Sequence, residues 1–214
     1  MSPIVHTIVT TVGGILAGLA LAGTLLWRQH QALLAARHDA THDELTGLPN
    51  RRLLLTRLRA ALNHHGCFGL VLLDLDRFKT VNDTFGHDTG NVLLAQVGRL
   101  LEGLDAPIEI AARLSGDEFA LLVRGDRDDV VAAAHAAWSS ISGAPLHLDN
   151  DATTIDIGTS VGFTLLRLGM SPRQVLAEAD QAMYQAKRLG LGVWGHSPLT
   201  EPAGYGRSRD RHHH

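Results

Sequence analysis

Hydrophobic and polar residues follow one another along this chain with periods that indicate helices and strands in turn. Apolar residues between 51 and 64 recur every three or four positions, which is typical of one face of a helix. Residues 68–73 are apolar without interruption, as in a strand that is buried on both faces. By the same criteria, further helices are expected at 90–101, 128–138 and 171–188, and further strands at 108–114, 119–123 and 153–166.

Two local signals set boundaries in this pattern. The runs 108–114 and 119–123 flank a short polar segment, so we expect them to pair as a hairpin. Ser171 and Pro172 suit the N-cap and the first position of the last helix. The alternation of helices and strands predicts an α/β domain in which helices cover a sheet.

A long uncharged segment precedes this domain. From Ile4 to Trp27 the chain has no Asp, Glu, Lys or Arg, and about 20 such residues suffice to cross a bilayer as a helix. A buried core helix and a cleaved signal peptide are the alternatives, but no Lys or Arg precedes the segment and no clear cleavage site follows it. Because arginines lie on its C-terminal side, the positive-inside rule predicts a single pass through the inner membrane with the domain in the cytoplasm.

The composition leaves room for one domain and its appendages: 45% of the 214 residues are hydrophobic and 19% are charged. Leu26 and Leu33 lie one heptad apart, so the stretch after the uncharged segment forms either a dimerising helical stalk or a solvated linker. Residues after Trp194 are rich in Gly, Pro, Ser, Arg and His, as in a disordered tail. The expected parts are a transmembrane anchor at 1–28, a helical stalk at 29–42, the domain at 43–195 and the tail at 196–214.

Charge and cysteine content narrow the function classes. The formal net charge of −3 argues against a partner that is a nucleic-acid polymer, and leaves open a small phosphorylated ligand that binds through a metal. The single cysteine, Cys67, excludes an intrachain disulfide and is expected to be buried, because it opens an apolar run. The thirteen histidines are scattered without cysteine or carboxylate at zinc-binding spacing.

Carboxylates interrupt two of the apolar elements at their ends. Asp74 and Asp76 close an otherwise uncharged strand, and Asp117 and Glu118 lie at the turn of the predicted hairpin. Clustered carboxylates repel one another unless a cation joins them, and oxygen ligands at strand ends suit Mg²⁺ that binds together with substrate phosphates. The alternative is that they are ordinary turn residues, since Asp is favoured in turns.

These carboxylates belong to five sequence blocks that occur in a fixed order. The blocks are Asp43–Arg52, Asp74–Lys79, Asn82–Gly90, Arg113–Phe119 and Ala179–Lys187. Together they resemble the GGDEF family of diguanylate cyclases from about Asp39 to Val193. The resemblance implies a palm-like nucleotidyl-cyclase fold, with a central, mostly antiparallel sheet flanked by helices.

The resemblance also implies an activity. Each domain of a homodimer would hold one GTP, and each ribose 3′-oxygen would attack the α-phosphate of the partner's GTP with loss of pyrophosphate. The product would be cyclic di-GMP. Mg²⁺ is the implied cofactor and Mn²⁺ an alternative, because such phosphoryl transfer is assisted by divalent metals.

The matching positions imply roles for individual residues. The metal ligands would be Asp74, the carbonyl of Leu75 and Asp117, and either Asp117 or Glu118 would help to deprotonate the 3′-hydroxyl. The substrate-binding residues would be Phe78 and Lys79 through their backbone, Lys79 and Lys187 through their ammonium groups, and Asn82 and Asn91 at the guanine edge. Outside the site, an ion pair is expected between Asp43 and Arg113, and core positions for Phe85 and Phe119.

Four departures from the family pattern bear on activity. Ser115 replaces the first glycine of the signature, and Leu191 removes one basic phosphate contact. Asn91 replaces an acid at the guanine edge, and its amide could also face adenine. The segment 106–109 lacks the inhibitory Arg-x-x-Asp pattern. Two alternatives to an active diguanylate cyclase therefore stay open, which are a cyclase with altered purine choice and a degenerate domain that binds a nucleotide or a partner without catalysis.

Overall fold

The computed structural model describes residues 21, 23–31, 40–64, 66–143, 145–148 and 153–196. The chain divides into two units, Met1–His42 and Asp43–His214. Each is described by itself, and nearly all of the described residues belong to the second. Of the tail predicted at 196–214, only His196 belongs to the described residues.

The first unit does not provide a membrane span among its described residues. Residues 21 and 23–31 are helical, and no helix in the described part of the chain is long and apolar enough to cross a bilayer. A helix rises only about 1.5 Å per residue, whereas a hydrocarbon core is about 30 Å thick. This finding contradicts the predicted single-pass location in the inner membrane. Most of the expected anchor and stalk, at 1–20, 22 and 32–39, lies outside the described residues.

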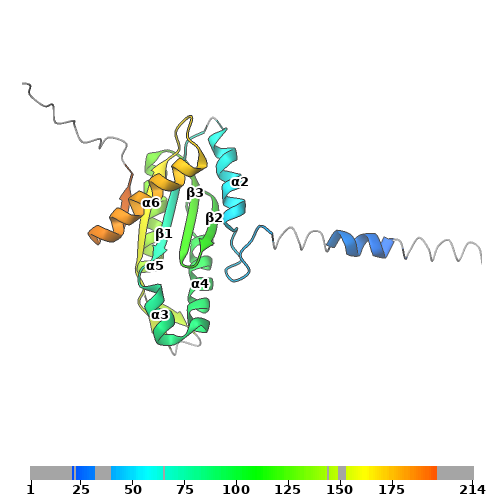
Figure 1. Ribbon diagram of the computed structural model, residues 1–214, viewed down its shortest axis with the longest axis horizontal. Coiled ribbons are helices and arrows are strands. Elements are labelled where there is room, and N and C mark those ends of the chain that lie inside the picture. Colours follow the sequence, from blue (N-terminus) through cyan, green and yellow to red (C-terminus); the bar gives the residue numbers. More distant parts are fainter. Residues whose placement is uncertain are drawn as a thin grey trace, which may run out of the picture. The chain divides into compact units, whose positions relative to one another are not determined.

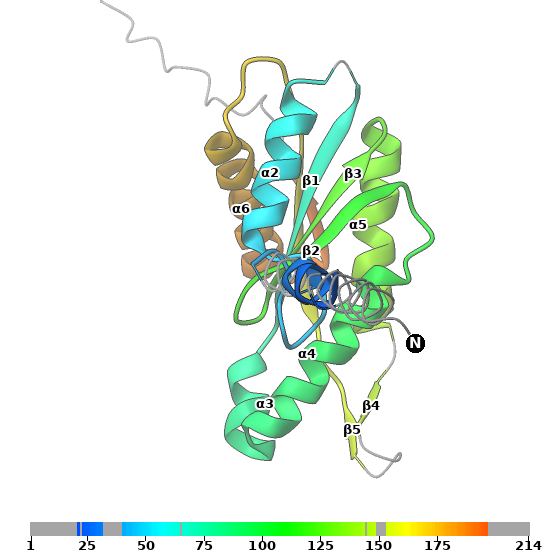
Figure 2. The same cartoon turned by 90° about the vertical axis from the view of Figure 1, so that its right-hand side faces the viewer.

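The second unit is built on a mixed sheet of five strands in the order β2-β3-β1-β6-β7 (Figure 1). The pairs β2–β3, β3–β1 and β1–β6 are antiparallel, and only the pair β6–β7 of this sheet is parallel, so the predicted mostly antiparallel sheet is confirmed. The strands are β1 (Phe68–Leu75), β2 (Ile108–Ser115), β3 (Glu118–Arg124), β6 (Thr159–Leu165) and β7 (Val193–Gly195). A separate hairpin pairs β4 (Leu146–Leu148) with β5 (Thr153–Ile155) (Figure 2).

Helices cover both faces of the sheet, as the α/β pattern predicts. The helices are α2 (Arg51–Leu62), α3 (Phe78–Phe85), α4 (His87–Glu102), α5 (Arg127–Ser142) and α6 (Pro172–Leu189). Successive residues of β1 point to opposite faces: Leu70 and Leu72 pack with α2 and α6, whereas Val71 and Leu73 pack with α4 and α5. All four are almost fully buried, which explains why the run 68–73 carries no polar residue.

Three expectations differ from the structure. The predicted strand 153–166 is two strands, since β5 pairs with β4 in the separate hairpin whereas β6 pairs with β1 in the sheet. Cys67 is exposed, since it lies just before β1 and not in it. Phe119 is fully buried as expected, but Phe85, at the end of α3, is 48% exposed.

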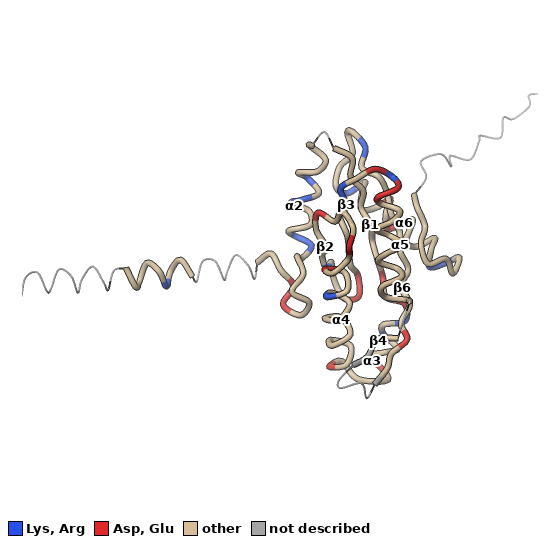
Figure 3. Tube along the Cα trace, turned by 180° about the vertical axis from the view of Figure 1, so that it is seen from behind, with Lys and Arg blue, Asp and Glu red and all other residues tan. Residues whose placement is uncertain are grey.

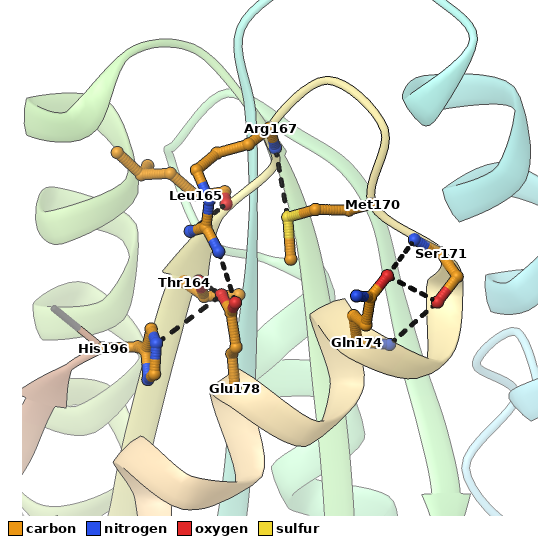
Figure 4. Close-up of polar contacts among 8 residues, drawn as sticks. All are labelled: Thr164, Leu165, Arg167, Met170, Ser171, Gln174, Glu178 and His196. Carbon is orange, nitrogen blue, oxygen red and sulfur yellow. Dashed lines mark hydrogen bonds and ion pairs between the residues drawn. The ribbon is translucent and has the colours of Figure 1, made fainter. Parts of the chain in front are cut away.

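Glu178 links three elements beside the sheet (Figure 4). From α6 it accepts a 2.7 Å hydrogen bond from the Thr164 hydroxyl of β6, and it pairs with Arg167 just after that strand. His196, which follows β7, lies 3.9 Å away. Partial burial raises the pKa of Glu178, but the hydrogen bonds from Thr164 and Arg167 outweigh it and hold the pKa below 4.5.

The charge of Glu178 should therefore stabilise the domain in a pH-dependent way. A carboxylate whose pKa is lower in the folded state adds stability above its unfolded pKa, near 4.5, and that stability is lost as the pH falls through the folded value. At pH 7 we expect Glu178→Gln to lower the free energy of unfolding by about 1–2 kcal/mol, since it weakens charged hydrogen bonds. Urea denaturation at pH 7 and pH 3.5 measures this. The deficit should shrink at pH 3.5, whereas Glu102→Gln, an exposed change on α4, should have little effect at either pH.

Candidate active site

The end of β1 and the turn between β2 and β3 meet at one edge of the sheet. Asp74, near the end of β1, lies opposite Glu118 on β3 and opposite Ser160 on β6. Asp74 and Glu118 continue the series of side chains that faces α2 and α6, because the side chains at 70 and 72, and at 120 and 122, face these helices. The Leu75 N–H bonds to the carbonyl of Asp117 at 3.3 Å. The structure thus brings the two predicted carboxylate pairs to the same edge.

Arg113 holds the turn between β2 and β3 through hydrogen bonds. Its Nε and Nη2 donate to the Gly116 carbonyl at 3.0 and 2.8 Å, and its Nη1 donates to Asp43 Oδ1 at 2.9 Å. The predicted ion pair between Asp43 and Arg113 is therefore confirmed. Gly116 adopts a φ of +46°, which favours glycine. Ser115 fits the turn, and its hydroxyl donates to Glu118 Oε2 at 2.8 Å.

One ammonium group lies among the carboxylates of this edge. Lys187, on α6, donates a hydrogen bond to Asp74 Oδ2, and this bond, aided by the charges of Asp74, Asp76 and Asp117, raises the pKa of Lys187. Partial burial raises the pKa of Asp117 above 3.8, and the charges of Asp74 and Glu118 act in the same direction, whereas its backbone hydrogen bond and Lys187 oppose the shift. The site thus has excess negative charge.

Two buried hydroxyls of β6 hold the end of β1, and sequence reasoning missed both. Thr159 Oγ1 donates to the Asp74 carbonyl at 3.0 Å, and Ser160 Oγ donates to Asp76 Oδ1 at 2.8 Å. They are among the few buried polar side chains of the described residues. The only sequence signal was a pair of polar residues at the start of an otherwise apolar strand. Both bonds fix the direction of the β1 terminus, so Thr159 and Ser160 are positioning residues.

The oxygen ligands at this edge suit a metal ion that binds both to the protein and to a substrate. In the described part of the chain, no three His, Cys, Asp or Glu side chains gather as a metal cage. The predicted set consists of two carboxylates, Asp74 and Asp117, and the carbonyl of Leu75. Mg²⁺ accepts one or two carboxylates and completes its shell with water and phosphate oxygens, so these residues fit it.

The remaining predicted residues lie on α3 and α4. A Cβ at Gly90 would collide with Asn82 Oδ1 and lie 3.2 Å from Phe78 Cζ, so Phe78 and Asn82 pack closely where Gly90 leaves room. Asn91, the next residue of α4, is exposed, as is Lys79 on α3. Among the described residues, no side-chain hydrogen bond or ion pair joins this group to Asp74, Asp117 or Lys187. The structure therefore shows two groups of predicted site residues, one at the sheet edge and one on the helix pair.

Of the cavities that border the sheet edge, two are lined by predicted site residues. Glu118 lines one of about 220 Å³ together with Arg51 of α2 and Asp180 of α6. Lys187 lines another, of about 460 Å³, which extends to Leu191 and Trp138. Leu191 is 43% exposed and presents an apolar side chain to this cavity. At this position the resemblance leads one to expect a basic residue.

Charges elsewhere on the domain are mixed. Acidic and basic residues are interspersed along the trace (Figure 3), in line with the net charge of −3. Glu109, the last residue of the segment 106–109, lies 3.4 Å from Arg124 and 4.0 Å from Arg57. It is thus engaged with arginines of β3 and α2.

Comparisons with known proteins identify relatives of this chain. The family model described as "Diguanylate cyclase, GGDEF domain" matches residues 40–192. The diguanylate cyclase TpbB of Pseudomonas aeruginosa is 34% identical over 172 residues, which are 77% of this chain and 39% of TpbB. An uncharacterised signalling protein of Caulobacter vibrioides is 36% identical over 163 residues, 74% of this chain and 20% of that protein. The chain therefore spans less than half the length of these relatives.

Solved structures show the same fold. The coiled coil and GGDEF domain of DgcB from Caulobacter crescentus, in complex with c-di-GMP, superimposes with a TM-score of 0.75 at 31% identity, covering 84% of this chain and 97% of that one. The diguanylate cyclase SiaD of Pseudomonas aeruginosa, in complex with its activator SiaC, gives a TM-score of 0.68 at 29% identity, covering 90% and 75%.

Proposed function

Because the chain belongs to the GGDEF family of diguanylate cyclases, we propose that it condenses two GTP molecules into cyclic di-GMP with release of two pyrophosphates. The observation that carries this proposal is the meeting of Asp74, Asp117 and Lys187 at one sheet edge. A domain that only bound a partner would have no need of such a cluster. Residues 43–195 would form the cyclase domain, 29–42 a stalk and 196–214 a tail.

The reaction needs a base, cations for the phosphates and two facing domains. Asp117 or Glu118 would accept the proton of the 3′-hydroxyl, and the raised pKa of Asp117 is a shift in the direction that a general base requires. The 3′-oxygen would then form a bond to the α-phosphorus, while the bond to the bridging oxygen breaks and pyrophosphate leaves. Two such transfers close the ring, so we propose a homodimer with one GTP on each domain.

The chain's own residues would bind and orient the triphosphate. Lys187 and Lys79 would contact phosphate oxygens, and the N–H groups of Phe78 and Lys79, at the start of α3, would donate to them. Asp74, Asp117 and the carbonyl of Leu75 would hold Mg²⁺ or Mn²⁺. When bound, the metal would neutralise the charge that develops on the phosphate oxygens.

Incubation of the protein with Mg²⁺ and GTP, ATP or both, followed by mass spectrometry of the products, tests the proposal. Cyclic di-GMP from GTP alone is the expected result. Binding of GTP without any cyclic product, at protein concentrations that allow dimers, would favour the degenerate binding domain instead.

Asn91 supports a second candidate, a cyclase with altered purine choice. It lies exposed beside the place where Asn82 packs on Gly90, and its amide can donate as well as accept. We expect Asn91→Asp to raise the ratio of GTP to ATP incorporation about 10-fold, since a carboxylate accepts from guanine but repels the acceptor nitrogen of adenine. Equimolar GTP and ATP, with cyclic products counted by mass spectrometry, measure the ratio. Asp88→Asn, on the same turn, serves as the control, and an unchanged ratio in Asn91→Asp would exclude Asn91 as a purine selector.

A further inference from the structure

The cavity of about 460 Å³ beside Lys187 has an uneven distribution of charge. Of the described residues that line it, only Arg77 and Lys187 are cations, and Asp76 is the one carboxylate. The wall formed by Leu191 and Trp138 is apolar, and these side chains are 43% and 36% exposed. A nucleoside triphosphate carries several negative charges, so the cations that line the cavity decide whether it can hold one.

Lys187 is already engaged by protein carboxylates. It donates to Asp74, and the charges of Asp74, Asp76 and Asp117 all act on it. Much of its positive charge is therefore balanced before any substrate binds. A second cation is needed if the cavity is to bind phosphate, because the neighbouring carboxylates compete with phosphate for Lys187.

Arg77 meets this need by its position and its lack of partners. Among the described residues that line the cavity, it is the cation whose side chain makes no hydrogen bond or ion pair. It lies between β1 and α3, two residues before the exposed Lys79. Its planar guanidinium can donate two parallel hydrogen bonds to a phosphate, which an ammonium cannot do.

The backbone of Arg77 is also unusual. Its φ of 57° and ψ of 26° are left-handed, and it is the only described residue other than glycine with a positive φ. This conformation costs an ordinary residue about 1–2 kcal/mol, and glycine would avoid the cost. Strain of this kind is typical of positions where a side chain serves a ligand. Arg77 is the N-cap residue of α3, so it lines the cavity from the position that directly precedes this helix.

We infer that Arg77 is the second phosphate-binding cation of this cavity and binds the triphosphate together with Lys187. The inference rests on the proposed function, because it names a contact of the same substrate. Arg77 would act on the phosphates only, and not on the base. Removal of the Arg77 side chain should therefore weaken the binding of nucleoside triphosphates and leave the binding of nucleosides unchanged.

Arg77→Gly is the informative variant, because glycine tolerates the left-handed backbone and only the side chain is lost. Calorimetric titration with a non-hydrolysable GTP analogue and Mg²⁺ should show affinity reduced about 10-fold or more, the usual effect of losing a charge-assisted hydrogen bond. Titration with guanosine should be unchanged. Arg77→Lys should recover part of the lost affinity, and Arg188→Ala, an arginine of α6 that does not line the cavity, should match the parent.

Two results would overturn the inference. Equal affinity of the parent and Arg77→Gly for the GTP analogue would show that Arg77 does not touch the phosphates. An equal loss for the analogue and for guanosine would show that the side chain only supports α3. Failure of the proposed function is distinguishable, since it appears as absence of cyclic product from the parent even where the binding of the analogue depends on Arg77.

Discussion

Asp117→Asn should lower the rate of cyclic di-GMP formation by about 100-fold to 10,000-fold, the range expected for loss of a general base. If Asp117 also holds the metal, the loss should lie at the upper end. Asp117 is in a turn and belongs to neither core cluster, so the fold should persist. Chromatographic assay of the product at saturating GTP measures the rate, and circular dichroism measures the fold.

Asp74→Asn tests the other carboxylate of the pair. It should lower the rate to a similar extent, because it removes a proposed metal ligand and the charged partner of Lys187. Asp105→Asn, an exposed carboxylate after α4, is the matched control and should retain the parent rate. Parent-like turnover in either Asp117→Asn or Asp74→Asn would remove that residue from the proposed site.

The parts of the fold that were predictable have local causes. Ser171 caps α6 with a reciprocal bond to Gln174, as the Ser-Pro start indicates. The hairpin of β2 and β3 follows from two apolar runs around a turn that contains Gly116. In both cases the signal lies within a few residues of the feature that it specifies.

The parts that were missed depend on partners far along the chain. Helix α3 has only eight residues, including Asn82 and Asp83, which are weak helix formers, so its stability comes from packing on α4. Thr159 and Ser160 acquire their roles only once β6 pairs with β1 in one register, which brings together residues about 85 positions apart. The exposure of Phe85 similarly depends on the position where α3 ends and α4 begins.

The carboxylate site combines both kinds of information. Asp74 and Asp117 were identifiable because they interrupt apolar runs and belong to sequence blocks that match the GGDEF family. That Asp74 and Glu118 share one face, by contrast, follows from the pairing of β1 with β3, and the contact of Asp74 with Lys187 follows from the packing of α6 on the sheet. Residue identity thus indicated the chemistry, and the tertiary structure specifies which groups can act together.

Gly162→Ala should be among the most destabilising single substitutions in the domain. Gly162 is in the middle of β6, where α6 crosses it, and an added Cβ would lie 2.5 Å from the Cα of Met183 and closer still to the Met183 nitrogen and the Ala179 carbonyl. These are backbone atoms of a helix and cannot rotate away. Overpacking usually costs about 1–3 kcal/mol, and we expect a value at or above the upper end because the whole helix must move.

The same substitution should also reduce activity beyond its effect on stability. Lys187 lies one helical turn after Met183 on the same face of α6, so a helix pushed away from β6 carries Lys187 away from Asp74. Urea denaturation gives the free energy of unfolding, and the product assay under conditions where the variant is folded gives the rate. Gly66→Ala is the matched control, because its added Cβ would meet side-chain atoms of His64 and Phe68 at 3.1 Å and no backbone atom. A Gly162→Ala variant as stable as Gly66→Ala would mean that α6 can shift on the sheet without cost, and full activity in addition would mean that the contact between Lys187 and Asp74 does not matter for catalysis.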